Sequence, residues 1–334
     1  MRCFRYLNFA VLICLAGTFV SCEQTEYRVH EGQTQGTFYE IKYKVTKGIC
    51  YEDEIIRILK DFNASLSAYI PTSVISRVNQ SDPTVVVDDL FRTVFNKSVE
   101  IHDASGGIFD ITIAPIVNFW GFGFTDSKPE VNHEIIDSLM QYVGMHKIRI
   151  TGDRVEKDLP GVMLDVNAIA KGFAVDVVAD FLKSKGVKNL MVNIGGECVA
   201  HGKNPDGNHW RLGVLKPTDK NVDALQAVVT LNNRAMATSA NTQRFVIIDG
   251  VRFSHTIDVK TGFPATHNLL SATVVADDCM TADAWATVFM AAGLEKSKQF
   301  LQKHTELEAL LIYSDENGIF QTFVTNGMDV VILN

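Results

Sequence analysis

The chain has 334 residues and a formal net charge of −8, from 31 basic and 39 acidic side chains. Apolar residues make up 46% of it, beside 23 glycines and 8 prolines. This composition excludes a disordered, collagen-like or low-complexity chain. The acidity excludes a broad binder of nucleic-acid phosphates, so no nucleic acid is expected as a partner. The length suits two domains or one large, two-lobed domain.

The N-terminus has the features of an export signal. Arg2 and Arg5 precede an apolar run over 7–20, which is followed by Ser21 and Cys22. At about 14 residues the run is too short to cross a bilayer. It resembles a bacterial lipoprotein signal over 1–21, with Cys22 carrying the lipid; the alternative is ordinary cleavage that leaves Cys22 as a free thiol. The expected location is a bacterial cell membrane, with the protein lipid-anchored and facing the periplasm or the cell exterior.

Three further cysteines follow Cys22. Cys50, Cys198 and Cys279 lie far apart and form neither a disulfide framework nor a CxxC metal motif. We expect them to be small buried side chains; the alternative is that two of them form one disulfide outside the cytoplasm.

The first half of the chain predicts a strand and several helices. Polar residues over 22–34 indicate a tether ahead of one domain over 35–334. Alternating apolar and polar residues from Thr37 to Val45 predict a half-buried strand. Apolar residues at helical spacing predict helices over 52–66 and 88–104, and a third that begins after Asn132.

The second half is richer in strands. A strand ending near Val166 leads into a helix that Gly186 ends, and Asp249-Gly250 predicts a hairpin turn. Strands and helices do not alternate regularly, so we expect the α+β class rather than a doubly wound sheet. The expected strands lie over 190–194, 210–215, 224–231, 244–249, 251–257, 270–276, 309–313, 320–324 and 330–333, with a helix over 281–292.

The junction over 164–172 is the first candidate for a binding site. A strand that runs into a helix leaves unpaired N–H groups and a partial positive charge at the helix start, which suits a phosphate. Lys171 would add a full charge. Asp165 either accepts a hydrogen bond from a ligand or acts as a plain helix cap.

Three further motifs have both a chemical and a structural interpretation. Gly195-Gly196 allows a ligand to approach the backbone closely, or forms a turn after a strand. His255 supplies a proton acceptor near neutral pH, or is structural. Asp283 and Thr287 lie one helical turn apart, and their oxygens suit Mg²⁺; alternatively Thr287 bonds to a helical carbonyl and Asp283 is exposed.

These motifs, in the same order along nearly the whole chain, resemble the ApbE family of FAD:protein FMN transferases. The resemblance implies an ApbE-like two-lobed mixed α/β domain with largely antiparallel or mixed sheets. The matching segments are 35–37, 66–69, 76–79, 107–112, 120–123, 164–176, 193–197, 237–239, 254–262 and 280–287.

The resemblance implies a reaction in which FAD is split at its pyrophosphate. FMN passes to a Thr or Ser hydroxyl of an extracytoplasmic acceptor protein, and AMP leaves. The implied acceptors are flavoprotein subunits of membrane redox complexes.

The family pattern also implies roles for individual residues. Mg²⁺ is held by a backbone oxygen at Ala168 and by the side chains of Asp283 and Thr287, and His255 helps to deprotonate the acceptor hydroxyl. Tyr69, Phe109 and Trp120 are available to line a flavin or adenine pocket, while Trp120 is equally suited to a core. The implied FAD contacts are Gln35, Tyr69, Ile108, Phe109, Asp110, Asp165, Lys171 and Ile257.

Two other activities fit the same residues. An FAD pyrophosphatase would use water in place of the acceptor hydroxyl and yield FMN and AMP. A tethered FAD-binding protein would hold the flavin without chemistry.

Overall fold

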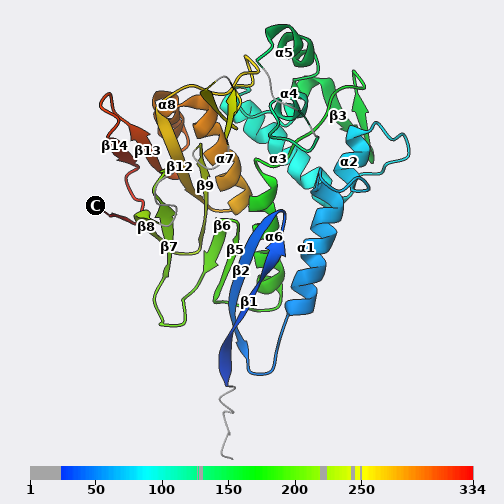
Figure 1. The fold of residues 1–334 in the computed structure, drawn as a ribbon. Helices are drawn as coiled ribbons and strands as arrows, with labels where there is room; N and C mark the ends of the chain where they lie inside the picture. The colour runs from blue at the N-terminus through cyan, green and yellow to red at the C-terminus, as the bar shows by residue number, and fades with distance from the viewer. Residues whose placement is uncertain are drawn as a thin grey trace, which may run out of the picture.

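The computed structural model describes residues 24–125, 127, 131–218, 224–241, 245–248 and 250–333. Within these ranges, the central element is an antiparallel sheet of eight strands in the order β1-β2-β5-β6-β9-β12-β13-β14 (Figure 1). The strands are β1 (Thr25–Thr34), β2 (Thr37–Thr46), β5 (Leu190–Ile194), β6 (Glu197–His201), β9 (Arg234–Ala240), β12 (Leu269–Ala276), β13 (Glu308–Ser314) and β14 (Phe320–Val324).

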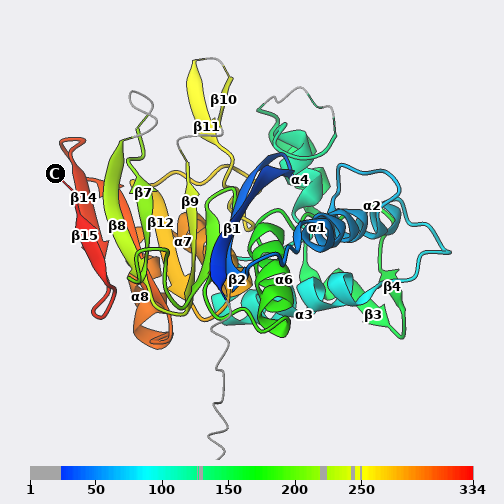
Figure 2. The same ribbon diagram turned by 90° about the horizontal axis from the view of Figure 1, so that it is seen from below.

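Helices cover one face of this sheet and enclose the main core. Both views place α6 between α1 and the β1–β2 hairpin (Figures 1 and 2). Helix α7 packs against α6, β9 and β12. The helices of this layer are α1 (Glu52–Leu66), α3 (Asp89–Ser105), α6 (Ala170–Ser184), α7 (Cys279–Ala292) and α8 (Leu294–Lys303).

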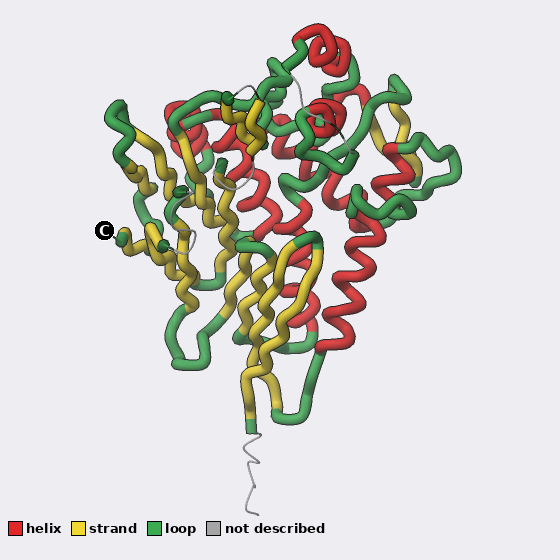
Figure 3. Tube along the Cα trace, in the orientation of Figure 1, coloured by secondary structure: helices red, strands yellow, loops and turns green. Residues whose placement is uncertain are grey.

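A smaller antiparallel sheet covers the opposite face. It consists of β7 (Trp210–Leu215), β8 (Leu225–Leu231) and β15 (Val330–Ile332). Met191 and Cys198 of the large sheet pack with Trp210 in a second core between the two sheets. The tube drawing shows the strands gathered on one side and most helices on the other (Figure 3). This arrangement confirms the α+β class with largely antiparallel sheets.

A third core lies beneath two short helices and a hairpin. Its elements are α4 (Ala114–Phe119), α5 (His133–Met140), β10 (Phe245–Ile248) and β11 (Val251–Ser254). Trp120 is fully buried there and donates its indole N–H to the carbonyl oxygen of Gly262, 2.8 Å away. Trp120 therefore serves the core and is not exposed to line a ligand pocket.

Hydrophobic periodicity correctly predicts the early elements. In β2 the alternating Ile41, Tyr43 and Val45 are buried, as expected of a half-buried strand. The helix expected over 88–104 is α3, and Asp88 caps it by accepting the Phe91 N–H. Asn132 caps α5 in the same way, and the apolar face of α1 is buried.

The tether expected over 22–34 is wrong for most of its length. Residues 25–34 form β1, which pairs with β2 along its whole length through a two-residue turn at Gln35 and Gly36. Both turn residues have positive φ, 50° and 71°, as this tight hairpin requires. Strand β1 is polar because it is an edge strand, with only one neighbour in the sheet.

Several other expectations need correction. The strand expected before Val166 is reduced to a single parallel bridge between Ile113 and Met163. The strand expected over 251–257 ends at Ser254. Of the three later cysteines, Cys198 and Cys279 are buried as expected, but Cys50 is exposed. Elements not predicted are β6, β9, α4, α8, α2 (Val74–Asn79), β3 (Ile148–Thr151), β4 (Arg154–Lys157) and a 3₁₀ turn at Met145–Lys147.

The remaining predicted elements lie within a few residues of their expected positions. The signal over 1–21, Cys22 and Asp249 of the predicted hairpin turn lie outside the described residues. Among the helices that are described, none has the length and apolar character needed to cross a membrane.

Helices α6 and α7 are in close contact at Gly172. A Cβ atom at this position would collide with the carbonyl oxygen of Cys279 and lie 2.8 Å from the Cβ of Asp283. Because backbone cannot move aside as a flexible side chain can, only glycine allows this spacing. The approach brings Asp283 of α7 to the start of α6.

Gly172→Ala should therefore destabilise the protein, although the same change stabilises an ordinary helix interior by about 1 kcal/mol. We expect a loss of about 1–3 kcal/mol in the free energy of unfolding, because the two helices must separate. Chemical denaturation measures it. Asp180→Ala, on the exposed face of α6, is the control and should change stability by less than about 0.5 kcal/mol. A Gly172→Ala protein as stable as the parent would contradict the close contact.

Candidate functional site

A cluster of charged side chains, two buried carboxylates and one partly exposed ammonium, lies where α6, α7 and β6 meet. The Lys171 ammonium is 3.1 Å from Oε1 of Glu197 and 3.8 Å from Oδ1 of Asp283. The two carboxylates are only 3% and 2% exposed. Glu197 begins β6, so the cluster joins the sheet to both helices of the main core.

The cluster has an excess of negative charge when Glu197 is ionised. Burial alone would lower the pKa of Lys171, but the carboxylates of Asp283 and Glu197 outweigh burial and raise it above its usual value. Lys171 is therefore fully protonated at neutral pH. Burial raises the pKa of Glu197 to about 7, although Lys171 opposes this shift. Oε2 of Glu197 is buried and has no hydrogen-bond partner, which is costly for a carboxylate.

Asp283 has a second role at the start of α6. Its Oδ2 accepts a hydrogen bond from the backbone N–H of Gly172 at 2.9 Å. The N–H of Ala170 donates to the carbonyl oxygen of Val166. The helix start that the sequence offers to a phosphate is thus partly occupied by protein acceptors, and Asp283 is buried rather than exposed.

Thr287 and Ala168 complete the implied metal set, and each lies a few residues from a member of the cluster in the sequence. Thr287 follows Asp283 by one turn of α7, and its hydroxyl lies 3.4 Å from the hydroxyl of Ser239 on β9. Ala168 lies two residues before α6 and packs, partly buried, against the main core. Helix α7 therefore carries two oxygen-bearing side chains, Asp283 and Thr287, of which Asp283 lies at the start of α6.

The segment over 76–79 contacts the site through Asn79. Its buried side chain donates to the carbonyl oxygen of Leu164 at 2.9 Å and accepts the N–H of Leu164 at 2.7 Å. The next residue, Asp165, donates its N–H to Ile111 and accepts the N–H of Asn167 with its carboxylate. These bonds fix the loop that leads into α6.

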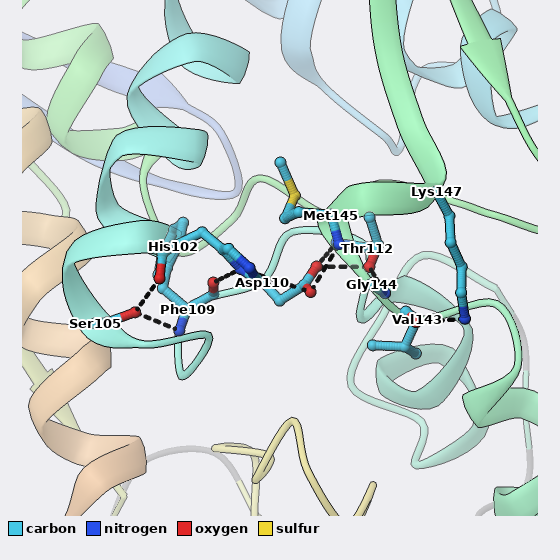
Figure 4. Close-up of polar contacts among 9 residues, drawn as sticks. All are labelled: His102, Ser105, Phe109, Asp110, Thr112, Val143, Gly144, Met145 and Lys147. Atoms are coloured by element: carbon cyan, nitrogen blue, oxygen red, sulfur yellow. Dashed lines mark hydrogen bonds and ion pairs between the residues drawn. The ribbon is translucent and has the colours of Figure 1, made fainter.

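Asp110 holds a network of its own (Figure 4). One carboxylate oxygen accepts from both the N–H and the hydroxyl of Thr112, and the other accepts from the N–H of Met145 at 3.1 Å. His102 lies 3.7 Å from the same carboxylate and also bonds to the backbone oxygen of Phe109. Asp110 thus ties the end of α3 to the turn after α5. A flavin contact for Asp110 stays a prediction.

The implied pocket aromatics have different surroundings. Phe109 is buried in the main core, like Trp120 in its own core, whereas Tyr69 is 53% exposed and contacts Phe124 edge to face. Ile108 is partly buried beside the main core. Of the three aromatic residues, Tyr69 alone offers an accessible ring in the described structure.

His255 and Ile257 follow the end of β11. The imidazole of His255 is partly buried and lies 6.2 Å from the ring of Phe122, edge to face. Ile257 is buried in the third core and pairs with Pro264 in an isolated bridge. The segment over 254–262 is therefore packed on the segment over 120–123.

Gln35 and the paired glycines lie at two neighbouring hairpin ends. Gly195 and Gly196 form the two-residue turn between β5 and β6, so their turn interpretation is correct. A groove of about 610 Å³ runs between this turn and β1–β2. The side-chain Nε2 of Gln35 is buried without a hydrogen-bond partner. An FAD contact for Gln35 stays a prediction.

Sequence reasoning missed the role of Glu197. The residue belongs to a matching segment, but its contact with Lys171 joins residues 26 positions apart on different elements. No local pattern signals such a pair. The one sequence feature that could have drawn attention to Glu197 is its position directly after the glycine pair Gly195-Gly196.

The chain is similar to known proteins along most of its length. The profile of the ApbE family matches residues 35–311. The chain belongs to the ApbE family. A FAD:protein FMN transferase of Vibrio cholerae is 37% identical over 92% of this chain and 93% of its own length. One of Haemophilus influenzae is 35% identical over 97% and 96% of the two chains.

Solved structures of the family have the same fold. The flavin transferase ApbE from Vibrio cholerae superposes with a TM-score of 0.81 at 35% identity, covering 91% of this chain and 98% of that one. The apo flavinyl transferase ApbE of Pseudomonas stutzeri also gives a TM-score of 0.81, at 31% identity over 91% and 96% of the two chains.

The excess negative charge of the cluster predicts cation binding that depends on Glu197. Glu197→Gln keeps the shape of the side chain and removes the charge that Glu197 carries above its pKa of about 7, so above that pH we expect the affinity for Mn²⁺, a spectroscopic substitute for Mg²⁺, to fall about tenfold. Electron paramagnetic resonance of free Mn²⁺ measures it. Glu31→Gln, at an exposed position on β1, is the control. Equal Mn²⁺ affinity in Glu197→Gln and the parent would contradict this interpretation.

Proposed function

We propose that this protein transfers FMN from FAD to a Thr or Ser hydroxyl of an acceptor protein and releases AMP. The observation that carries the proposal is the cluster of Lys171, Glu197 and Asp283, which offers both a fixed cation and surplus carboxylate charge. FAD carries a pyrophosphate, and a pyrophosphate bound to a divalent cation matches both features. The relatives are FAD:protein FMN transferases, which supports the same reaction.

The residues present fit a bound Mg²⁺. Two buried carboxylates face one ammonium among the described residues of the cluster, and one oxygen of Glu197 lacks a partner. Hard cations take carboxylate, hydroxyl and backbone oxygens. Asp283, Thr287 and the backbone oxygen of Ala168 would hold the ion. When bound, Mg²⁺ neutralises charge on the pyrophosphate oxygens.

The residues of the chain supply the remaining parts of the reaction. The acceptor oxygen forms a bond to the phosphorus of the FMN half, and the bond from that phosphorus to the bridging oxygen breaks. AMP leaves with the bridging oxygen, and the hydroxyl proton passes to His255. Lys171 stabilises the charge that develops on the leaving phosphate, since its position is already fixed by two carboxylates.

The proposed partner rests on the resemblance to the family, and the proposed location rests on the signal-like N-terminus. The acceptor is a flavoprotein subunit of a membrane redox complex, and the anchor is a lipid on Cys22. The enzyme and its acceptor then share one membrane surface outside the cytoplasm. FAD is the other partner.

Flavin transfer is tested by incubating the chain with FAD, Mg²⁺ and an acceptor protein that contains an Asp-Gly-x-Thr/Ser-Gly-Ala-Thr-like segment. We expect a flavin-sized mass gain on the acceptor and in-gel fluorescence. Asp283→Ala should lose the Mg²⁺-dependent reaction because it removes a metal-binding carboxylate. Asp180→Ala, exposed on α6, should retain it.

Each alternative activity gives a different outcome in the same assay. FMN and AMP without labelled acceptor would identify a pyrophosphatase. FAD that binds and is never cleaved would identify a flavin carrier. An unchanged Mg²⁺ response in Asp283→Ala would contradict the metal assignment.

The lipid anchor is tested by Cys22→Ala in a bacterial host. Without an acylated cysteine we expect the chain to incorporate no labelled palmitate, because Cys22 is the expected acyl acceptor. Cys50→Ala is the matched control and should be labelled like the parent. A Cys22→Ala chain that still incorporates the label would contradict the anchor.

A further inference from the structure

A second group of ligating side chains lies at the base of the β1–β2 hairpin. His30 comes from β1, Cys50 from the loop after β2, and Glu52 is the first residue of α1. One potential ligand atom from each of the three lies within 4.8 Å of the other two. None of these residues belongs to the proposed flavin-transfer site.

We propose that His30, Cys50 and Glu52 form a metal site for Zn²⁺. Imidazole nitrogen, thiolate sulfur and carboxylate oxygen are the three ligand types that zinc takes in proteins, whereas Mg²⁺ and Ca²⁺ take oxygen alone. Glu52 Oε2 lies 3.5 Å from Nδ1 of His30, which is close to the separation between two ligands of a tetrahedral ion. Cys50 Sγ lies 3.9 Å from the other ring nitrogen, Nε2, so its exposed thiol has to turn toward Nδ1 to share the ion.

The imidazole of His30 is held in place by a hydrogen bond with Tyr43. Tyr43 is fully buried, and its hydroxyl lies 2.8 Å from Nε2 of His30 while accepting the backbone N–H of Tyr51 at 2.9 Å. A metal-binding histidine is usually held by such an outer hydrogen bond, which fixes the ring. His30 itself is only 8% exposed, so it has little freedom to turn.

Access and charge also suit a cation. Cys50 and Glu52 are exposed, so an ion reaches the site from solvent and Cys50 releases its thiol proton to buffer on binding. The nearby Arg28 is paired with Glu26 at 2.6 Å, which offsets its positive charge. Three protein ligands leave a fourth position for water.

A bound ion would tie the hairpin to α1. His30 lies on β1, and the other two ligands flank the start of the helix, so the ion bridges the edge strand of the sheet and a helix of the main core. This role is independent of flavin transfer, so the zinc proposal does not depend on the proposed function.

The test uses the full chain titrated with Co²⁺ and then with Zn²⁺. We expect one equivalent of Co²⁺ to give a thiolate-to-cobalt absorption band that Zn²⁺ abolishes. Cys50→Ala should lose the band, and Glu52→Gln should bind Zn²⁺ about tenfold or more weakly. Both positions are exposed, so these variants should fold. Asp53→Asn removes a neighbouring exposed charge on α1 and should bind like the parent.

The same preparations give a second readout from thermal unfolding. Zn²⁺ should raise the unfolding midpoint of the parent and of Asp53→Asn, and leave that of Cys50→Ala unchanged. A parent without the cobalt band, or a Cys50→Ala chain that binds Zn²⁺ with the affinity and stoichiometry of the parent, would overturn the proposal.

Discussion

The contact between α6 and α7 at Gly172 determines the geometry of the proposed flavin-transfer site. Because this residue has no side chain, α7 comes close enough for Asp283 to accept the N–H of Gly172 itself. That bond leaves the other oxygen of the same carboxylate facing Lys171. Glu197 reaches Lys171 from the sheet, so two helices and a strand meet at one ammonium. Packing and electrostatics thus depend on one glycine.

Such a cluster lowers the stability of the folded protein but favours the binding of a cation. Two carboxylates removed from water oppose each other, and one ammonium offsets only part of their charge. The protein retains this arrangement in a region whose surroundings are otherwise apolar. A divalent cation together with an anionic pyrophosphate would complete the charge balance. A chain of net charge −8 can thus bind an anionic substrate, because its positive charge is concentrated locally.

The sequence predicts those parts of the fold that depend on local periodicity. Helix α1 and strand β2 are predicted because their apolar residues repeat every third or fourth and every second position. Strand β1 is missed because an edge strand needs few apolar residues, and β9 because its small residues have no strong strand pattern. The resemblance points to Asp283 and Lys171, but the partnership of Lys171 with Glu197 is a long-range contact that appears only in the folded chain. The burial of Trp120 also depends on the fold.

The central claim is that an acceptor hydroxyl, rather than water, attacks the FMN phosphorus. The most direct measurement is the reaction of FAD, Mg²⁺ and acceptor in water enriched in ¹⁸O, followed by mass spectrometry of the flavin product. Transfer to the acceptor predicts FMN joined to a Thr or Ser residue with no ¹⁸O in its phosphate. Free FMN that carries one ¹⁸O atom, formed while the acceptor stays unmodified, would contradict it.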